Sequence, residues 1–82
     1  MTTQNDLKRQ AARRALDYLP NDDYIGVGSG STVSLFIEEL VAKKDRIRGV
    51  VAASLESREL LEKLGINVVA LADVGKLPVY FD

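Results

Sequence analysis

Apolar positions recur along the chain with two different spacings. In three segments they return every three or four residues, which is typical of amphipathic helices. The first segment ends before Pro20, the second begins near Ser31, and the third covers residues 55–65 and ends in a glycine. The apolar positions of the first two helices are Leu7, Ala11, Ala12, Ala15, Leu16, Tyr18 and Leu19, then Val33, Phe36, Ile37, Leu40 and Val41.

Short continuous apolar runs separate these helices, and we predict that they are buried strands. They cover residues 24–27, 49–54, 66–71 and 77–82. Strands that alternate with helices and lack a polar face indicate a parallel sheet. The sequence therefore predicts an α/β fold, a Rossmann-like parallel sheet of strand order 3-2-1-4 with flanking helices.

Composition narrows the chemistry that this fold could carry. The 82 residues have a formal net charge of −1 and contain neither histidine nor cysteine, which removes imidazole bases, thiolate nucleophiles and the usual zinc ligands. The polar N-terminus lacks a signal-peptide core, and no run of about 18 apolar residues is present. We expect a cytoplasmic protein that uses no cofactor or metal and binds neither membranes nor nucleic acid.

A loop rich in glycine and hydroxyl groups joins the first strand to the second helix. Its sequence is Gly28, Ser29, Gly30, Ser31, Thr32. In the predicted sheet this loop lies at the carboxyl edge, where the unpaired N–H groups of a helix N-terminus favour an anion. The alternative is a tight turn in which Ser31 or Thr32 only caps the helix.

Two familiar nucleotide motifs do not fit this loop. A dinucleotide fingerprint would need a glycine at Ser31 and an acidic residue near Ser54, and a P-loop would need a lysine within the turn. What remains is a set of amide and hydroxyl groups of a size that suits a phosphate monoester.

Lys8 and Asp82 are the charged candidates for this site. Lys8 falls within the apolar stripe of the first helix, so it either reaches the phosphate or extends along the surface to solvent, whereas Arg9, Arg13 and Arg14 are expected on a solvated face. In strand order 3-2-1-4, Asp82 ends beside the loop, where it could hold sugar hydroxyls, transfer a proton or merely cap a turn.

Two serines follow the second strand. Ser54 and Ser57 could add hydroxyl groups at the same edge of the sheet. For Ser54 the simpler interpretation is the N-cap of the third helix.

The segments IGVGSGSTVSLFIEEL, GVVAAS, LEKLGINVVALADV and LPVYFD resemble, in this order, the N-terminal part of the ribose-5-phosphate isomerase A family. The resemblance implies interconversion of ribose 5-phosphate and ribulose 5-phosphate through an enediolate, a step of the pentose phosphate pathway. By it, Ser29, Gly30, Ser31 and Thr32 belong to the substrate loop, Lys8 lies near the phosphate, and Asp82 is the first aspartate of a DGADE motif.

The sequence departs from that family in two ways. Ala52 and Ala53 stand where serines are common, and the family's second aspartate, its lysine and its general-base glutamate all come after residue 82. Residues 1–82 therefore resemble the N-terminal part of a sugar-phosphate-binding domain. We expect these 82 residues alone to be inactive. Because the last predicted strand would be an unpaired edge in so small a core, we expect either a fragment or a chain completed by partner subunits in a homo-oligomer.

Two other functions stay open at this stage. The chain could be a non-catalytic sugar-phosphate effector module, although its first helix alone is no helix-turn-helix. A nucleotide-binding module is the third alternative, and the missing fingerprint glycine weakens it.

Overall fold

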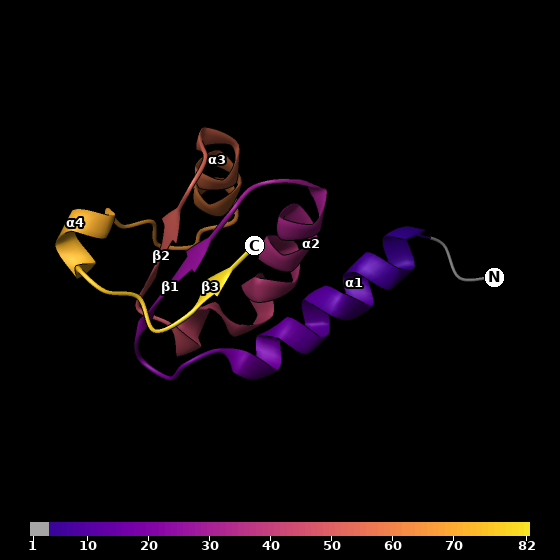
Figure 1. Cartoon of the computed structure of the whole chain (residues 1–82), viewed down its shortest axis with the longest axis horizontal. Helices are drawn as coiled ribbons and strands as arrows, with labels where there is room; N and C mark the ends of the chain where they lie inside the picture. The colour runs from indigo at the N-terminus through magenta and orange to yellow at the C-terminus, as the bar shows by residue number, and fades with distance from the viewer. Residues whose placement is uncertain (1–3) are drawn as a thin grey trace.

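The computed structural model describes residues 4–82, so the first three residues of the predicted domain lie outside it. Helices and strands alternate along the chain (Figure 1). The elements are α1 (Gln4–Ala15), the 3-10 turn η1 (Leu16–Tyr18), β1 (Tyr24–Val27), α2 (Ser31–Leu40), η2 (Val41–Arg46), β2 (Gly49–Ala52), α3 (Leu55–Lys63), α4 (Leu71–Val74) and β3 (Tyr80–Phe81).

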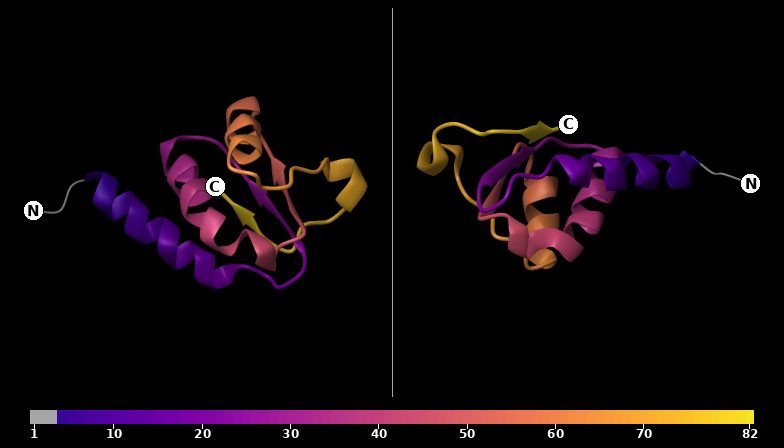
Figure 2. Two further views of the ribbon diagram at one scale, coloured as in Figure 1. Left: turned by 180° about the vertical axis from the view of Figure 1, so that it is seen from behind. Right: turned by 90° about the horizontal axis from the view of Figure 1, so that it is seen from below.

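The three strands form a parallel sheet in the order β2-β1-β3. Ile25 of β1 pairs with Val50 of β2, and Val27 pairs with Phe81 of β3. The view from below in Figure 2 shows α2 and α3 on one side of these strands. The predicted α/β class, with a parallel sheet and flanking helices, is confirmed.

The segment 66–71 differs from its prediction as a full strand. It contributes only an isolated parallel bridge between Val68 and Val50, supported by hydrogen bonds from Val50 N to Asn67 O and from Val69 N to Val50 O, both 2.9 Å long. The chain then enters α4 at Leu71, so the ladder cannot extend. The predicted order 3-2-1-4 survives with its outermost strand reduced to this bridge.

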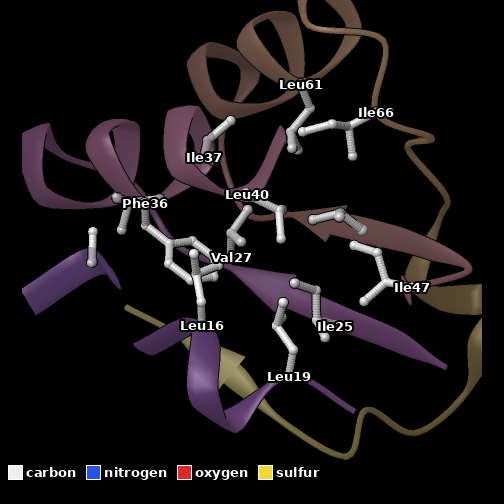
Figure 3. Close-up of a cluster of buried hydrophobic side chains, with 13 residues drawn as sticks. Leu16, Leu19, Ile25, Val27, Phe36, Ile37, Leu40, Ile47, Leu61 and Ile66 are labelled. Carbon is white, nitrogen blue, oxygen red and sulfur yellow. The ribbon is translucent and has the colours of Figure 1, made fainter. Parts of the chain in front are cut away.

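The core lies between the sheet and α2 (Figure 3). Ile25 and Val27 are buried because they share one face of β1, and the apolar side of α2 packs onto them through Phe36, Ile37 and Leu40. Three positions of the first helical pattern do not lie in the core, since Leu7 is 57% exposed, Tyr18 is 75% exposed and Ala11 is exposed as well. No helix within residues 4–82 is long and apolar enough to cross a membrane.

β3 is only two residues long, yet contacts on both of its faces hold it. The Phe81 ring stacks on Phe36 of α2, with ring centroids 4.4 Å apart and an interplanar angle of 24°. Gly26 faces the opposite side of the sheet because side chains alternate along a strand. The space next to Gly26 is filled by Tyr80 and Leu77, so β3 is fixed directly before Asp82.

Candidate anion-binding site

The glycine and hydroxyl loop connects the carboxyl end of β1 to the first turn of α2. Gly28 is buried and donates its N–H to the carbonyl of Phe81 over 2.8 Å, whereas residues 29–32 are exposed. Gly30 adopts a φ of +104° and is the N-cap of α2, without a side-chain cap hydrogen bond. The suggestion that Ser31 or Thr32 caps the helix is therefore wrong, since both lie within its first turn.

This capping geometry leaves donors at the loop surface. The first N–H groups of an α-helix have no partner within the helix, and here no side-chain oxygen at the N-cap takes one of them. The hydroxyl groups of Ser31 and Thr32 stand at the same helix end, where the backbone dipoles favour negative charge.

Lys8 brings a cation to the loop from α1. Its ammonium group donates a hydrogen bond to the hydroxyl oxygen of Ser31 over 2.9 Å, although the two residues are 23 positions apart in sequence. The structure thus places Lys8 beside the predicted loop, and Lys8 is only partly exposed.

An ion-pair cluster fixes α1 against α2 near Lys8. Arg9 and Arg13 both bind one carboxylate oxygen of Glu39, at 3.0 and 3.3 Å. The hydrogen bond from Arg9 is the main cause that lowers the pKa of Glu39, and the nearby charge of Arg13 adds to it. The side chains of Arg9 and Arg13 are 38% and 63% exposed, in line with the expected solvated face. The wheel of one helix could not show that they also meet Glu39 of α2.

Asp82 lies on the other side of the loop. A Cβ atom placed on Gly28 would collide with the Asp82 carboxylate, so only a glycine leaves the acid its present position. Asp82 also lines a hollow of about 190 Å³ together with Thr32, Phe36 and Phe81. The structure brings the acid and the helix N-terminus to one small concavity, as predicted from the strand order.

The two serines after β2 have separate structural roles. Ser54 caps α3, and its side-chain oxygen accepts the N–H of Ser57 over 3.1 Å, as expected for a cap. Ser57 is buried and donates its hydroxyl to the Gly28 carbonyl over 2.7 Å. Ser57 therefore does not offer a hydroxyl at the open edge. The only sequence feature that drew attention to Ser57 was its place three residues after Ser54, the expected cap.

The assembled site has hydrogen-bond donors on one side and a carboxylate on the other. Lys8, Ser31, Thr32 and the α2 N-terminus can hold an anionic group, and Asp82 can accept hydrogen bonds from hydroxyl groups nearby. Within residues 4–82 no group of three or more His, Cys, Asp or Glu side chains could hold a metal ion.

Comparison with known proteins gives a clear relationship. No family model matches the sequence. The chain is 48% identical over 82 residues to ribose-5-phosphate isomerase A of Neisseria meningitidis, and 52% identical over 79 residues to that of Mannheimia succiniciproducens. This chain matches a segment of the ribose-5-phosphate isomerase A family. It spans 37% and 36% of the lengths of these two relatives.

Solved structures of ribose-5-phosphate isomerase A have the same fold over this segment. The crystal structure from Neisseria gonorrhoeae aligns with a TM-score of 0.91 at 48% identity, covering 98% of this chain and 36% of that one. A D-ribose-5-phosphate isomerase in complex with phospho-erythronic acid aligns with a TM-score of 0.82 at 29% identity, covering 96% and 36%. The predicted family resemblance is confirmed.

Proposed function

We propose that this chain supplies the N-terminal phosphate-binding segment of a ribose-5-phosphate isomerase of the pentose phosphate pathway. The observation that carries the proposal is the hydrogen bond from Lys8 to Ser31, which brings a cation to a glycine-rich loop at a helix N-terminus. The identity to enzymes of that name supports it, as does the phospho-erythronic acid held by one structural neighbour.

In this proposal the phosphate lies against the loop at the start of α2. Lys8 supplies positive charge, the first N–H groups of α2 donate to the phosphate oxygens, and the exposed hydroxyls add further donors. The phosphate-binding residues are then Lys8, Ser29, Gly30, Ser31 and Thr32. Gly28, which was predicted with them, shapes the loop instead, because its N–H and its carbonyl are bonded to Phe81 and Ser57. Gly30 contributes through its backbone, and its outer side is open because nothing lies within 4 Å of a Cβ built there.

Asp82 then faces the sugar, and we assign it the catalytic role within this segment. Aldose–ketose interconversion through an enediolate moves a proton between neighbouring carbons while their oxygens gain and lose protons. A carboxylate beside the loop can hold a sugar hydroxyl in place or exchange a proton with it. Its position against Gly28 and next to Thr32 suits that role.

The chemistry of carbon deprotonation needs a further group. Among the described glutamates, Glu39 is bound to two arginines of α1, and Glu62 pairs with Arg58 on α3. The other three, Glu38, Glu56 and Glu59, are exposed on α2 and α3. We therefore propose that the general base comes from the portion of the relatives that this chain does not match. We also propose that the protein is cytoplasmic, forms a homo-oligomer and does not bind nucleic acid.

A binding experiment with matched ligands tests this function. We expect ribose 5-phosphate to shift the amide resonances of residues 28–32 in an NMR titration of the chain, and ribose to shift them far less, because the phosphate provides most of the contacts. Inorganic phosphate is the control for the anion alone. Equal effects of ribose and ribose 5-phosphate, or resonance shifts confined to other parts of the chain, contradict the proposal.

A further inference from the structure

Ser57 is the one buried polar side chain of the core among the described residues, at 5% exposure. It lies on the first turn of α3 and contacts the loop that leaves β1, 29 positions earlier in the sequence. Its hydroxyl donates to the Gly28 carbonyl over 2.7 Å, the usual distance for an O–H···O hydrogen bond.

The Gly28 carbonyl can only accept, so Ser57 is the donor to it, and the Ser57 oxygen is left to accept from Ser54. The Ser54 hydroxyl donates to the Ser57 oxygen over 3.1 Å, and Ser57 then donates to Gly28. Hydroxyl groups arranged in such a chain polarise one another, which strengthens the last bond. Because Ser54 is itself the cap of α3, the rigid start of α3 holds the loop.

Without the hydrogen bond from Ser57, the Gly28 carbonyl could turn toward a bound anion and weaken its binding. A carbonyl oxygen carries partial negative charge, so one that turned toward a phosphate would repel it. Each glycine carbonyl of the loop is occupied by a serine of a helix, because Ser34 donates both its N–H and its hydroxyl to the Gly30 carbonyl, at 3.0 and 3.1 Å. Both glycine carbonyls of the loop therefore already accept hydrogen bonds from within the protein.

We propose that Ser57 is a positioning residue that fixes the Gly28 carbonyl toward α3 and so keeps it away from bound phosphate. The same contact fixes the peptide against which Asp82 rests, since Gly28 meets the Asp82 carboxylate and donates its N–H to Phe81. Ser57 thus acts on both charged parts of the site without contacting the substrate. This inference rests on the proposed phosphate-binding function.

The test compares variants of Ser57 in the 82-residue chain, with inorganic phosphate and ribose 5-phosphate as ligands. We expect Ser57→Ala to raise both dissociation constants about tenfold, as for the loss of one strong hydrogen bond. Ser57→Cys keeps the volume but provides a weak donor, and we expect a similar loss. Ser57→Thr keeps the hydroxyl and should retain most of the affinity.

A stability control separates positioning from general destabilisation. Leu61 is fully buried on the same helix, so Leu61→Ala should lower the melting temperature at least as much as Ser57→Ala and leave both dissociation constants unchanged. Dissociation constants that track melting temperature across all four variants would overturn the proposal, as would parent-like affinity of a folded Ser57→Cys.

If the proposed phosphate-binding function is wrong, the same variants give a different result. If Lys8→Ala weakens phosphate binding and the Ser57 variants do not, phosphate binding stands and only the role of Ser57 is wrong. If neither Lys8→Ala nor the Ser57 variants alter the binding of either ligand, or the parent chain binds neither ligand, the proposed phosphate site itself is wrong.

Discussion

The ring of Phe81 stacks on the ring of Phe36, 4.4 Å away, and this contact joins the two halves of the candidate site. Phe36 belongs to the helix that begins at the phosphate loop, and Phe81 directly precedes Asp82. Stacked aromatic rings add about 0.5–1.5 kcal/mol beyond the area that they bury. The acid and the loop are therefore parts of one packed unit.

Lys8→Ala should weaken the binding of ribose 5-phosphate. A charged hydrogen-bond donor contributes about 1.5–3 kcal/mol, and Lys8 is held at the loop through Ser31. Lys8→Arg keeps the charge and is the matched control, with most of the affinity retained. The affinity of the parent should also fall with added salt more steeply than that of Lys8→Ala, measured by calorimetry. Parallel salt dependences would show that Lys8 does not contact the phosphate.

The hydroxyls of the first turn of α2 should contribute separately. We expect Ser31→Ala combined with Thr32→Ala to cost about 1–3 kcal/mol of ribose 5-phosphate binding through lost hydrogen bonds to a charged group. The exchange of Ser31→Thr with Thr32→Ser keeps both hydroxyls and serves as the control. Unchanged affinity of the double alanine variant would mean that the loop is only a turn.

Gly28→Ala should displace Asp82 while the phosphate contacts persist. The added Cβ would meet the end of the Asp82 side chain, which can swing away, so the loss of stability should be small. We expect weaker binding of ribose 5-phosphate with little change for inorganic phosphate. Gly75→Ala, at a φ of +82° and far from any neighbour, should cost about 1 kcal/mol of stability and no affinity. Equal losses for both ligands would contradict this assignment of Asp82.

Acidification should loosen α1 from α2. The Arg9 hydrogen bond lowers the pKa of Glu39 below its ordinary value of 4.5, so the folded state favours the charged form. This contribution to the free energy of unfolding is fully present above about pH 4.5 and is lost as the pH falls through the lower folded value. Thermal unfolding of the parent and of Glu39→Gln, followed from pH 7 to pH 3, should show a stability difference that disappears toward the acid end. A difference that stays constant over this range would show that Glu39 is not selectively stabilised in its charged form.

The 82-residue chain should not isomerise ribose 5-phosphate at an appreciable rate. Acid–base catalysis typically contributes a factor of about 10²–10⁴, and we assign its general base to the portion of the relatives that this chain does not match. The comparison is a coupled assay against a chimera in which this chain replaces the matching segment of the Neisseria gonorrhoeae relative. Equal turnover by the short chain would mean that one of its own carboxylates, with Asp82 the first candidate, is the base.

The sequence predicted the central strand and the burial of its neighbours well, for a physical reason. The run at residues 24–27 is apolar, is bounded by Asp23 and Gly28, and matches β1 at both ends. The run at residues 66–71 looked equally apolar, yet it pairs at one bridge only. The pattern named its neighbour correctly as the second strand, but it could not show that the two segments meet at Val68 and Val50 alone.

The site was predictable in its parts but not in its connections. The strand order predicted that Asp82 lies near the loop. Lys8 was a candidate because it falls within the apolar stripe of the first helix. The bond from Ser57 to Gly28 crosses 29 positions of sequence and depends on how α3 packs against α2 and β2. Likewise, Gly30 rather than Ser31 became the helix cap because the turn needs a positive φ.

Because β1 is the central strand in the order β2-β1-β3, we expect backbone amides on the two sides of the site to exchange with solvent deuterium at different rates. β1 is paired with β2 over its whole length, whereas β3 is joined to β1 only at Gly26 and Val27. Local opening begins at edges with few bonds, so amides that bond to β3 should exchange before those shared between β1 and β2. The loop leaves the slowly exchanging strand and Asp82 follows the rapidly exchanging one. Transient opening of β3 should therefore displace Asp82 while the loop stays anchored to β1.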